Sequence, residues 1–131
     1  MPYDDTEIVA EDELIRGIPA SQIKNGRVSS GAFKSSSDPY RGMSVDLASL
    51  EPEQVYPNEK HLGAVKFVAS CPREKNLLVG KDPIATNHAH CNIWRHEDGE
   101  AKSISTSQAR HMQKSSEWHV SIENVRIHGD S

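Results

Sequence analysis

Residues 63–69, Gly-Ala-Val-Lys-Phe-Val-Ala, carry the clearest strand pattern in this chain of 131 residues. The run is almost wholly apolar and is too short to span a membrane. Two other stretches, Met43-Ser-Val-Asp-Leu47 and Trp118-His-Val-Ser-Ile122, alternate apolar with polar residues, which is typical of half-buried strands. Together the three stretches predict a small sheet.

Shorter signals add to this sheet. Residues 32–34 and residues 90–94 are each predicted to form a brief strand. Between residues 23 and 28, the pair Asn25-Gly26 separates two half-apolar flanks, which is the strongest short-range signal for a hairpin whose turn has two positive φ values. We therefore expect a tight turn at this pair.

Three segments have helical signals. Residues 10–16 have apolar residues at mixed spacing before Gly17 and Pro19 end the run, and residues 103–116 have a loose apolar stripe. Pro52 suits the first turn of another short helix, because that position leaves its amide hydrogen unbonded and proline has none. The elements together predict an α+β fold with a small, mainly antiparallel sheet and two or three short helices.

Length and composition predict one compact domain. A chain of this size can form one core, and its hydrophobic content of 35% predicts a thin one. Residues 1–13 hold six acids and no Lys or Arg. We therefore expect an acidic, flexible N-terminal arm over residues 1–13 and a single compact α+β domain over residues 14–131.

Charge and cysteine usage exclude several functional classes. Outside the acidic arm, 15 basic residues stand against 13 acidic ones, so a nucleic-acid partner is not expected. The N-terminal residues lack the pattern of a secretory signal, and no apolar run reaches membrane-spanning length. Two cysteines, Cys71 and Cys91, do not resemble a disulfide framework. These features predict a soluble cytoplasmic protein with reduced thiols and no membrane contact.

The run from Asn87 to Cys91, Asn-His-Ala-His-Cys, brings amide, imidazole and thiol groups within five residues. His90 in this run is a candidate general acid or base, because imidazole changes its charge near neutral pH. Asp46 is a weaker candidate that would pair with His90 or with Arg27. The simpler interpretation makes Asp46 a solvent-facing carboxylate.

A nucleophile is a second hypothesis for the same run. Cys91 or Ser30 would attack a substrate, with His90 as the base. Adjacent residues of a strand point to opposite faces, however, so Cys91 and His90 would not meet. Burial in the core is the simpler explanation of Cys91.

Zinc binding is a third hypothesis. His88 and His90 would share one face of a strand, and Cys91, Cys71 or His96 could complete a tetrahedral site. The chain lacks a second close ligand pair, so loop or strand histidines without a metal are the simpler interpretation. No other cofactor is predicted.

Candidate anion ligands follow the hairpin turn. The Arg27 guanidinium, the hydroxyls of Ser29 and Ser30 and the backbone amides near Gly31 could clasp a phosphate or a carboxylate. The spacing is not that of a Walker loop. Hydroxyls that bond their own backbone in a turn are the alternative explanation.

Short motifs follow one another in a fixed order: Arg16-Gly-Ile-Pro19, Gly26-Arg-Val-Ser-Ser30 with Phe33 beyond, Ser44-Val-Asp46, Asp82-Pro83 and Asn87-His-Ala-His90. In this order, across residues 12–95, they resemble a family of small uncharacterised bacterial proteins with the pattern R-x-S-S-x-x-F, S-V-D and N-P-A-H. The family has proline where this chain has His88, which weakens the zinc hypothesis. The resemblance implies no activity, but it implies that six candidate residues gather in the fold: Arg27, Ser29, Ser30, Asp46, Asn87 and His90.

Two functions remain open from the sequence. The favoured hypothesis is a small noncatalytic binding or accessory module for a larger bacterial protein, with the acidic arm docking on a basic surface. The alternative is an enzyme or ligand-binding domain for a phosphate-bearing substrate. In that alternative Arg27, Ser29 and Ser30, with Asn87 nearby, hold the anion, and His90 is the general acid or base.

Overall fold

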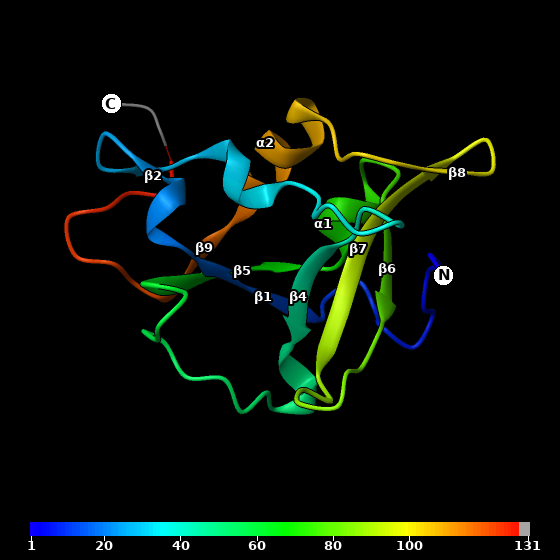
Figure 1. The fold of residues 1–131 in the computed structure, drawn as a ribbon, viewed down its shortest axis with the longest axis horizontal. Helices are drawn as coiled ribbons and strands as arrows, with labels where there is room; N and C mark the ends of the chain where they lie inside the picture. The colour runs from blue at the N-terminus through cyan, green and yellow to red at the C-terminus, as the bar shows by residue number, and fades with distance from the viewer. Residues whose placement is uncertain (129–131) are drawn as a thin grey trace.

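The computed structural model describes residues 1–128 and shows a mixed architecture built around one sheet (Figure 1). Within these residues there are two α-helices and three short 3-10 turns, and the sheet is mainly antiparallel. This arrangement is consistent with the predicted α+β class. Neither helix in the described part of the chain has the length and apolar character needed to cross a membrane.

The sheet follows the order β6-β7-β4-β1-β5-β9, and β8 also pairs with β7. All pairings between these strands, as far as the chain is described, are antiparallel. The strands predicted at 43–47, 63–69, 90–94 and 118–122 are confirmed, with small changes at their ends. The bounds are β1 Glu13–Ile18, β4 Met43–Leu47, β5 Gly63–Val68, β6 Leu78–Lys81, β7 His90–Glu97, β8 Glu100–Lys102 and β9 Glu117–Val120.

Residues 10–16 do not form the predicted helix, because β1 begins at Glu13 and runs through the middle of the sheet. β1 pairs with β5 at six positions. Leu14 and Ile18 are both fully buried. Two buried residues four positions apart are compatible with a helix and with a strand. The helix prediction was wrong because the pairing with the neighbouring strand, which the segment's own sequence does not show, decides between the two.

The hairpin predicted at Asn25-Gly26 is confirmed. β2 (Ile23–Lys24) pairs with β3 (Arg27–Val28), and the two turn residues have φ values of 54° and 73°. The strand predicted at residues 32–34 is wrong, because most of this segment belongs to the 3-10 turn η2 (Ser30–Phe33). That turn buries Phe33 completely in the core.

The helix predicted near residues 103–116 is confirmed as α2 (Thr106–Ser115). Its first turn carries a capping box, in which the Ser105 hydroxyl accepts from the Gln108 amide and the Gln108 side chain accepts from the Ser105 amide. α2 packs against η2 and against the short helix α1 (Ser70–Arg73). Apolar residues of all three elements join those of the strands in one core.

The acidic N-terminal residues, expected to be a flexible arm over 1–13, lie along the edge of the sheet. The Asp5 amide donates to the Val79 carbonyl of β6 at 2.8 Å, and Ile8 is only 1% exposed within the core. Three of the acids form ion pairs with cations of α1 and β6: Asp4 with Arg73, and Asp5 and Glu7 with Lys81. The chain's own cations therefore match much of this acidic charge.

Residues 51–62 form a loop, and the helix predicted at Pro52 is absent from this described segment. Glu51 ends the 3-10 turn η3 (Ala48–Leu50) in the left-handed region, with φ of 51°, which turns the chain away from a helical path. The Asn58 side-chain oxygen accepts from the amides of Lys60 and His61 and so fixes the loop. The loop runs on the side of the sheet away from α2 (Figure 1).

Candidate functional site

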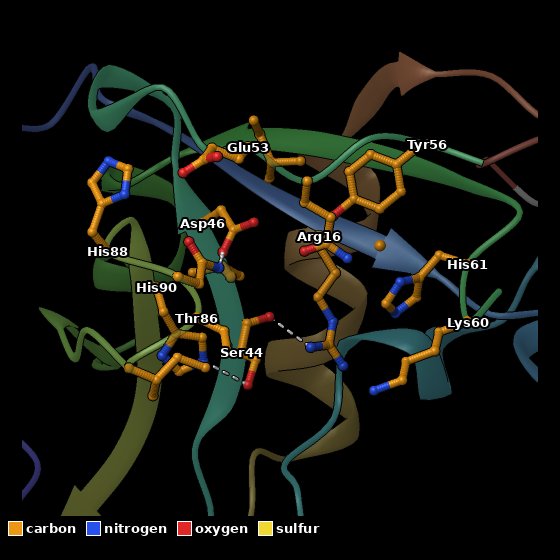
Figure 2. Close-up of a pocket in the computed structure, with 16 residues that line it drawn as sticks. Arg16, Ser44, Asp46, Glu53, Tyr56, Lys60, His61, Thr86, His88 and His90 are labelled. Carbon is orange, nitrogen blue, oxygen red and sulfur yellow. Dashed lines mark hydrogen bonds between the residues drawn. The ribbon is translucent and has the colours of Figure 1, made fainter. Parts of the chain in front are cut away.

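A cavity of about 560 Å³ lies on the side of the sheet away from α2 (Figure 2). The odd-numbered residues of β4 enter the core, so Ser44 and Asp46 point to the opposite face and form part of the cavity floor. The loop 51–62 supplies one wall and the loop 82–89 the other. Polar side chains from separate parts of the chain therefore meet here.

Arg16 on β1 is the central cation of the cavity. Its Nε donates to the Ala32 carbonyl at 2.9 Å, and its Nη1 donates to the Ser44 carbonyl at 2.6 Å. No carboxylate within residues 1–128 forms an ion pair with it. Burial lowers the pKa of the guanidinium to about 10, which leaves it charged at neutral pH. Arg16 thus retains further N–H donors and an unmatched positive charge beside the cavity.

The local strand geometry explains the place of this guanidinium. β1 and β4 pair at only two positions, Leu14 with Leu47 and Ile15 with Asp46. Beyond them, Arg16 satisfies the Ser44 carbonyl where strand pairing has ended. A second cavity of about 240 Å³ adjoins this point, and Arg16 and Ser44 line both cavities. The two residues therefore mark the junction of the cavities.

The His61 ring lies directly on the backbone of β1, near Arg16 (Figure 2). A Cβ at Gly17 would lie 2.6 Å from His61 Cγ, so this approach requires glycine. Burial, together with the charges of Arg16 and Lys60, lowers the pKa of His61, so the ring is neutral at pH 7. Its Nδ1 is buried with no hydrogen-bond partner among the described residues. We assign the proton to Nε2, because a buried N–H without an acceptor is costlier than a bare lone pair.

Charges are divided across the cavity. The cations Arg16 and Lys60 lie with the neutral His61 ring on one side, and the carboxylates of Asp46 and Glu53 lie on the other (Figure 2). The Tyr56 ring packs on His61 with the ring centroids 5.9 Å apart. Burial and the nearby Asp46 carboxylate raise the pKa of Tyr56 to about 12, which keeps its phenol neutral.

Asn87 attaches the loop 82–89 to β4. Its Nδ2 donates to Oδ1 of Asp46 at 2.7 Å, and its own Oδ1 accepts from the Ala89 amide at 3.1 Å. Asp46 is buried, with 5% of its surface exposed. This pair holds the loop against the strand and so shapes the wall beside His90.

His90 is the first residue of β7 and lies at the edge of the cavity. Its Nδ1 is 2.7 Å from the Asp82 carbonyl oxygen. Its Nε2 is 3.1 Å from Oγ of Ser44, the contact drawn as a dashed line in Figure 2. The structure thus brings four of the predicted site residues to this cavity: Asp46, Asn87, His88 and His90.

The predicted anion ligands at residues 27–30 lie elsewhere. Arg27 is in the small hairpin, where its backbone forms an isolated bridge to Arg126. The Ser29 hydroxyl accepts from the Gly31 amide at 2.9 Å and so caps η2, and Ser30 is the first residue of that turn. Neither Arg27, Ser29 nor Ser30 is among the described residues that line the main cavity. Among the described residues, Arg16 and Lys60 are the lysine and arginine side chains that line that cavity.

The candidate zinc ligands do not converge on one point among the described residues. His88 directs its Nε2 to the Leu50 carbonyl at 2.8 Å, whereas His90 bonds Ser44 and Asp82. Cys91 is fully buried, and burial with nearby carboxylates raises the pKa of its thiol to about 12. Within residues 1–128, no three His, Cys, Asp or Glu side chains are grouped to hold a metal. The zinc hypothesis stays a prediction.

Several residues of the cavity were not selected from the sequence, among them Arg16, Ser44 and His61. Arg16 stands between two buried residues of β1, Leu14 and Ile18, and a charge at such an inward position is a signal of function. The prediction of a helix over residues 10–16 obscured this signal, because a helix does not alternate inward and outward positions as a strand does. Ser44 shares a strand face with Asp46, so alternation could have identified it.

Comparisons with protein-family models, with curated proteins and with solved structures found no match to the chain.

Proposed function

We propose that the main cavity binds a small phosphate-bearing molecule, with Arg16 as the anchor of the phosphate. The observation that carries this proposal is a charged, partly buried guanidinium that two carbonyls hold in place and no described carboxylate neutralises. A buried charge without a counter-charge is costly, and an anionic ligand would supply that counter-charge. Guanidinium groups suit phosphate because their N–H donors match two phosphate oxygens at once.

The rest of the cavity defines the ligand class. Lys60 and the Nε2–H of His61 adjoin Arg16 and add positive potential and a donor for the phosphate. Asp46 and Glu53, across the cavity, would accept hydrogen bonds from hydroxyl or amino groups of the same molecule. The volume of about 560 Å³ is well above that of phosphate alone and falls within the usual range for small-molecule sites. A sugar phosphate or a mononucleotide fits this description.

The accessory-module hypothesis has less support. It depended on an acidic arm free to dock on a basic surface, yet Asp4, Asp5 and Glu7 form ion pairs within the chain. We therefore favour the ligand-binding alternative over a protein partner. A bacterial cytoplasm is our proposed setting, based on the motif resemblance and on two buried free thiols, Cys71 and Cys91.

Calorimetric titration with ribose 5-phosphate and with ribose tests the proposal. The phosphate ester is expected to bind at micromolar to millimolar concentration and to raise the unfolding temperature, while ribose does neither. Arg16→Gln is expected to weaken binding at least ~10-fold, because it removes charge-assisted hydrogen bonds to the phosphate. Lys60→Gln, which changes an exposed residue, is expected to weaken it less.

Arg110→Gln is the matched control, since this arginine is exposed on α2. The proposal is wrong if no phosphate ester, including mononucleotides, binds the folded wild-type protein more tightly than its dephosphorylated form. It is equally wrong if Arg110→Gln weakens binding as much as Arg16→Gln.

A further inference from the structure

We propose that Ser44 is a nucleophile that His90 activates, and that the site hydrolyses an acyl ester of a phosphate-bearing molecule. A nucleophilic hydroxyl, a base within hydrogen-bond reach and a third group that orients the base are the usual signature of covalent catalysis by serine. Here Ser44 Oγ lies 3.1 Å from Nε2 of His90, and the Asp82 carbonyl lies 2.7 Å from Nδ1. The assignment of the substrate class rests on the proposed phosphate-binding function.

The Asp82 carbonyl sets the tautomer of His90. A carbonyl oxygen only accepts hydrogen bonds, so in the neutral ring Nδ1 carries the proton and donates it to Asp82. Nε2 is then a bare lone pair that accepts from the Ser44 hydroxyl. This is the tautomer in which a histidine can take the serine proton.

The backbone around the pair is held in place. The Asp82 amide donates to the His90 carbonyl at 2.9 Å, while the His90 ring donates back to the Asp82 carbonyl. Ser44 lies in the register of β4 and β7, directly opposite Asn92, and Asp46 lies opposite His90. The base and the nucleophile therefore sit on paired strands, which keep their separation constant.

Ser44 is exposed, in contrast to the cysteine of the same region. Cys91 is fully buried with a raised thiol pKa, so it is no alternative nucleophile. Ser44 lies where both cavities meet, and Arg16 Nη1 is 2.6 Å from its carbonyl oxygen. Arg16 therefore lies beside the backbone of Ser44, close to the strand that carries the proposed nucleophile.

The second cavity suggests why the reacting group is an acyl ester. This cavity, of about 240 Å³, begins at Ser44, and Pro19 and the polar residues Gln22 and Lys34 are among those that line it. An ester whose alcohol part carries the phosphate would fill the main cavity with that part and direct its acyl group into the second. The scissile carbonyl would then lie at Ser44.

The proposed reaction balances without a cofactor. Ser44 Oγ forms a bond to the carbonyl carbon as its proton passes to Nε2 of His90, and the bond from that carbon to the ester oxygen then breaks. The leaving alcohol takes the proton from His90. Water next attacks the acyl-serine and gives a proton to His90, and Ser44 Oγ leaves with that proton as the carboxylic acid is released.

An alkyl fluorophosphonate tests Ser44 directly, since it forms a bond from serine oxygen to phosphorus and releases fluoride. We expect one adduct on the folded wild-type protein, located at Ser44 by peptide mass mapping. His90→Gln is expected to slow the labelling at least ~100-fold, the usual range for loss of a general base. Ser44→Ala is expected to abolish the adduct.

Two controls match these variants. His119→Gln and Ser107→Ala change exposed residues on β9 and α2 and are expected to label at the wild-type rate. The inference is overturned if folded wild-type protein carries no adduct at Ser44, or if His90→Gln, shown to be folded by circular dichroism, labels as fast as wild type.

Binding of ribose 5-phosphate, measured on the same wild-type preparation, separates the two proposals. Binding without an adduct at Ser44 retains the phosphate site and rejects the nucleophile. An adduct without binding of any phosphate ester retains the nucleophile and rejects the phosphate-bearing substrate.

Discussion

At the scale of single residues, Arg16 occupies a strand position where a side chain normally enters the core. Removing a guanidinium from water costs several kcal/mol. Its bonds to the carbonyls of Ala32 and Ser44, at about 1.5–3 kcal/mol each for a charged donor, offset much of that cost. No carboxylate of the described residues balances the positive charge of Arg16. Binding of an anion in the cavity would therefore stabilise this residue.

His61 predicts a pH dependence of stability. Its pKa is lowered in the folded protein from the ordinary value of 6.5, so the unfolded chain binds more protons than the folded one below that pH. The free energy of unfolding should therefore fall as the pH drops from about 7 toward about 5. Protonation of His61 would also place a positive charge beside Arg16 and Lys60, whose charges already lower its pKa.

Urea unfolding of His61→Gln at both pH values checks this prediction. The variant should lose less stability on acidification than wild type does, while His119→Gln, at an exposed site, should behave like wild type. An equal acid-dependent loss in wild type and His61→Gln would show that His61 does not contribute.

At the scale of the elements, each wall of the cavity is fixed by one asparagine. Asn58 accepts two backbone amides within the loop 51–62, and Asn87 joins the loop 82–89 to Asp46 of β4. Each loop contains only a few backbone hydrogen bonds of its own, such as those between Ile84 and Asn87, and these side chains add to them. The walls consequently depend on specific polar residues, whereas the floor depends on strand pairing.

The N-terminal cap of α2 allows the contribution of a local hydrogen bond to stability to be measured. Ser105→Ala removes the hydroxyl that accepts from the Gln108 amide, and the free energy of unfolding should fall by about 1 kcal/mol. Ser107→Ala, on the exposed face of the same helix, should change it by a few tenths at most, because alanine is the better helix former. Urea midpoints of the two variants test the capping box; equal effects would argue against it.

At the scale of the whole molecule, the N-terminal acidic segment is part of the fold. It adds a backbone hydrogen bond from Asp5 to β6 and places Ile8 in the core cluster. Tyr3 packs beside Trp94 of β7, with ring centroids 5.9 Å apart. The acidic composition suggested an arm, but the buried Ile8 and the ion pairs attach it to the sheet.

Replacing Ile8 tests this attachment. Ile8→Ala empties a site that is 1% exposed and should lower the free energy of unfolding by about 2–5 kcal/mol. Val9→Ala is the matched control, because Val9 is 52% exposed and should have little effect. Urea unfolding monitored by tryptophan fluorescence measures both. Similar small losses in the two variants would mean that the segment is not held in the core.

Local periodicity and turn chemistry allowed the sequence by itself to determine several elements. The strands at 43–47 and 63–68, the hairpin at Asn25-Gly26 and the helix α2 all follow from patterns that lie within each segment. His90 was identified because its chemistry is visible in its residue type. These features depend on neighbours a few residues away, which the sequence displays directly.

Only the tertiary structure decided that residues 13–18 are a strand, since the pairing with β5 comes from a segment about fifty residues later. It also decided the site, because Arg16, Ser44 and His90 meet only when β1, β4 and β7 align, and His61 joins them only when the loop 51–62 packs on β1. Strand order and loop packing depend on long-range contacts. The free energy of these contacts depends on the whole assembled sheet, and the contacts produce no periodic pattern in the sequence.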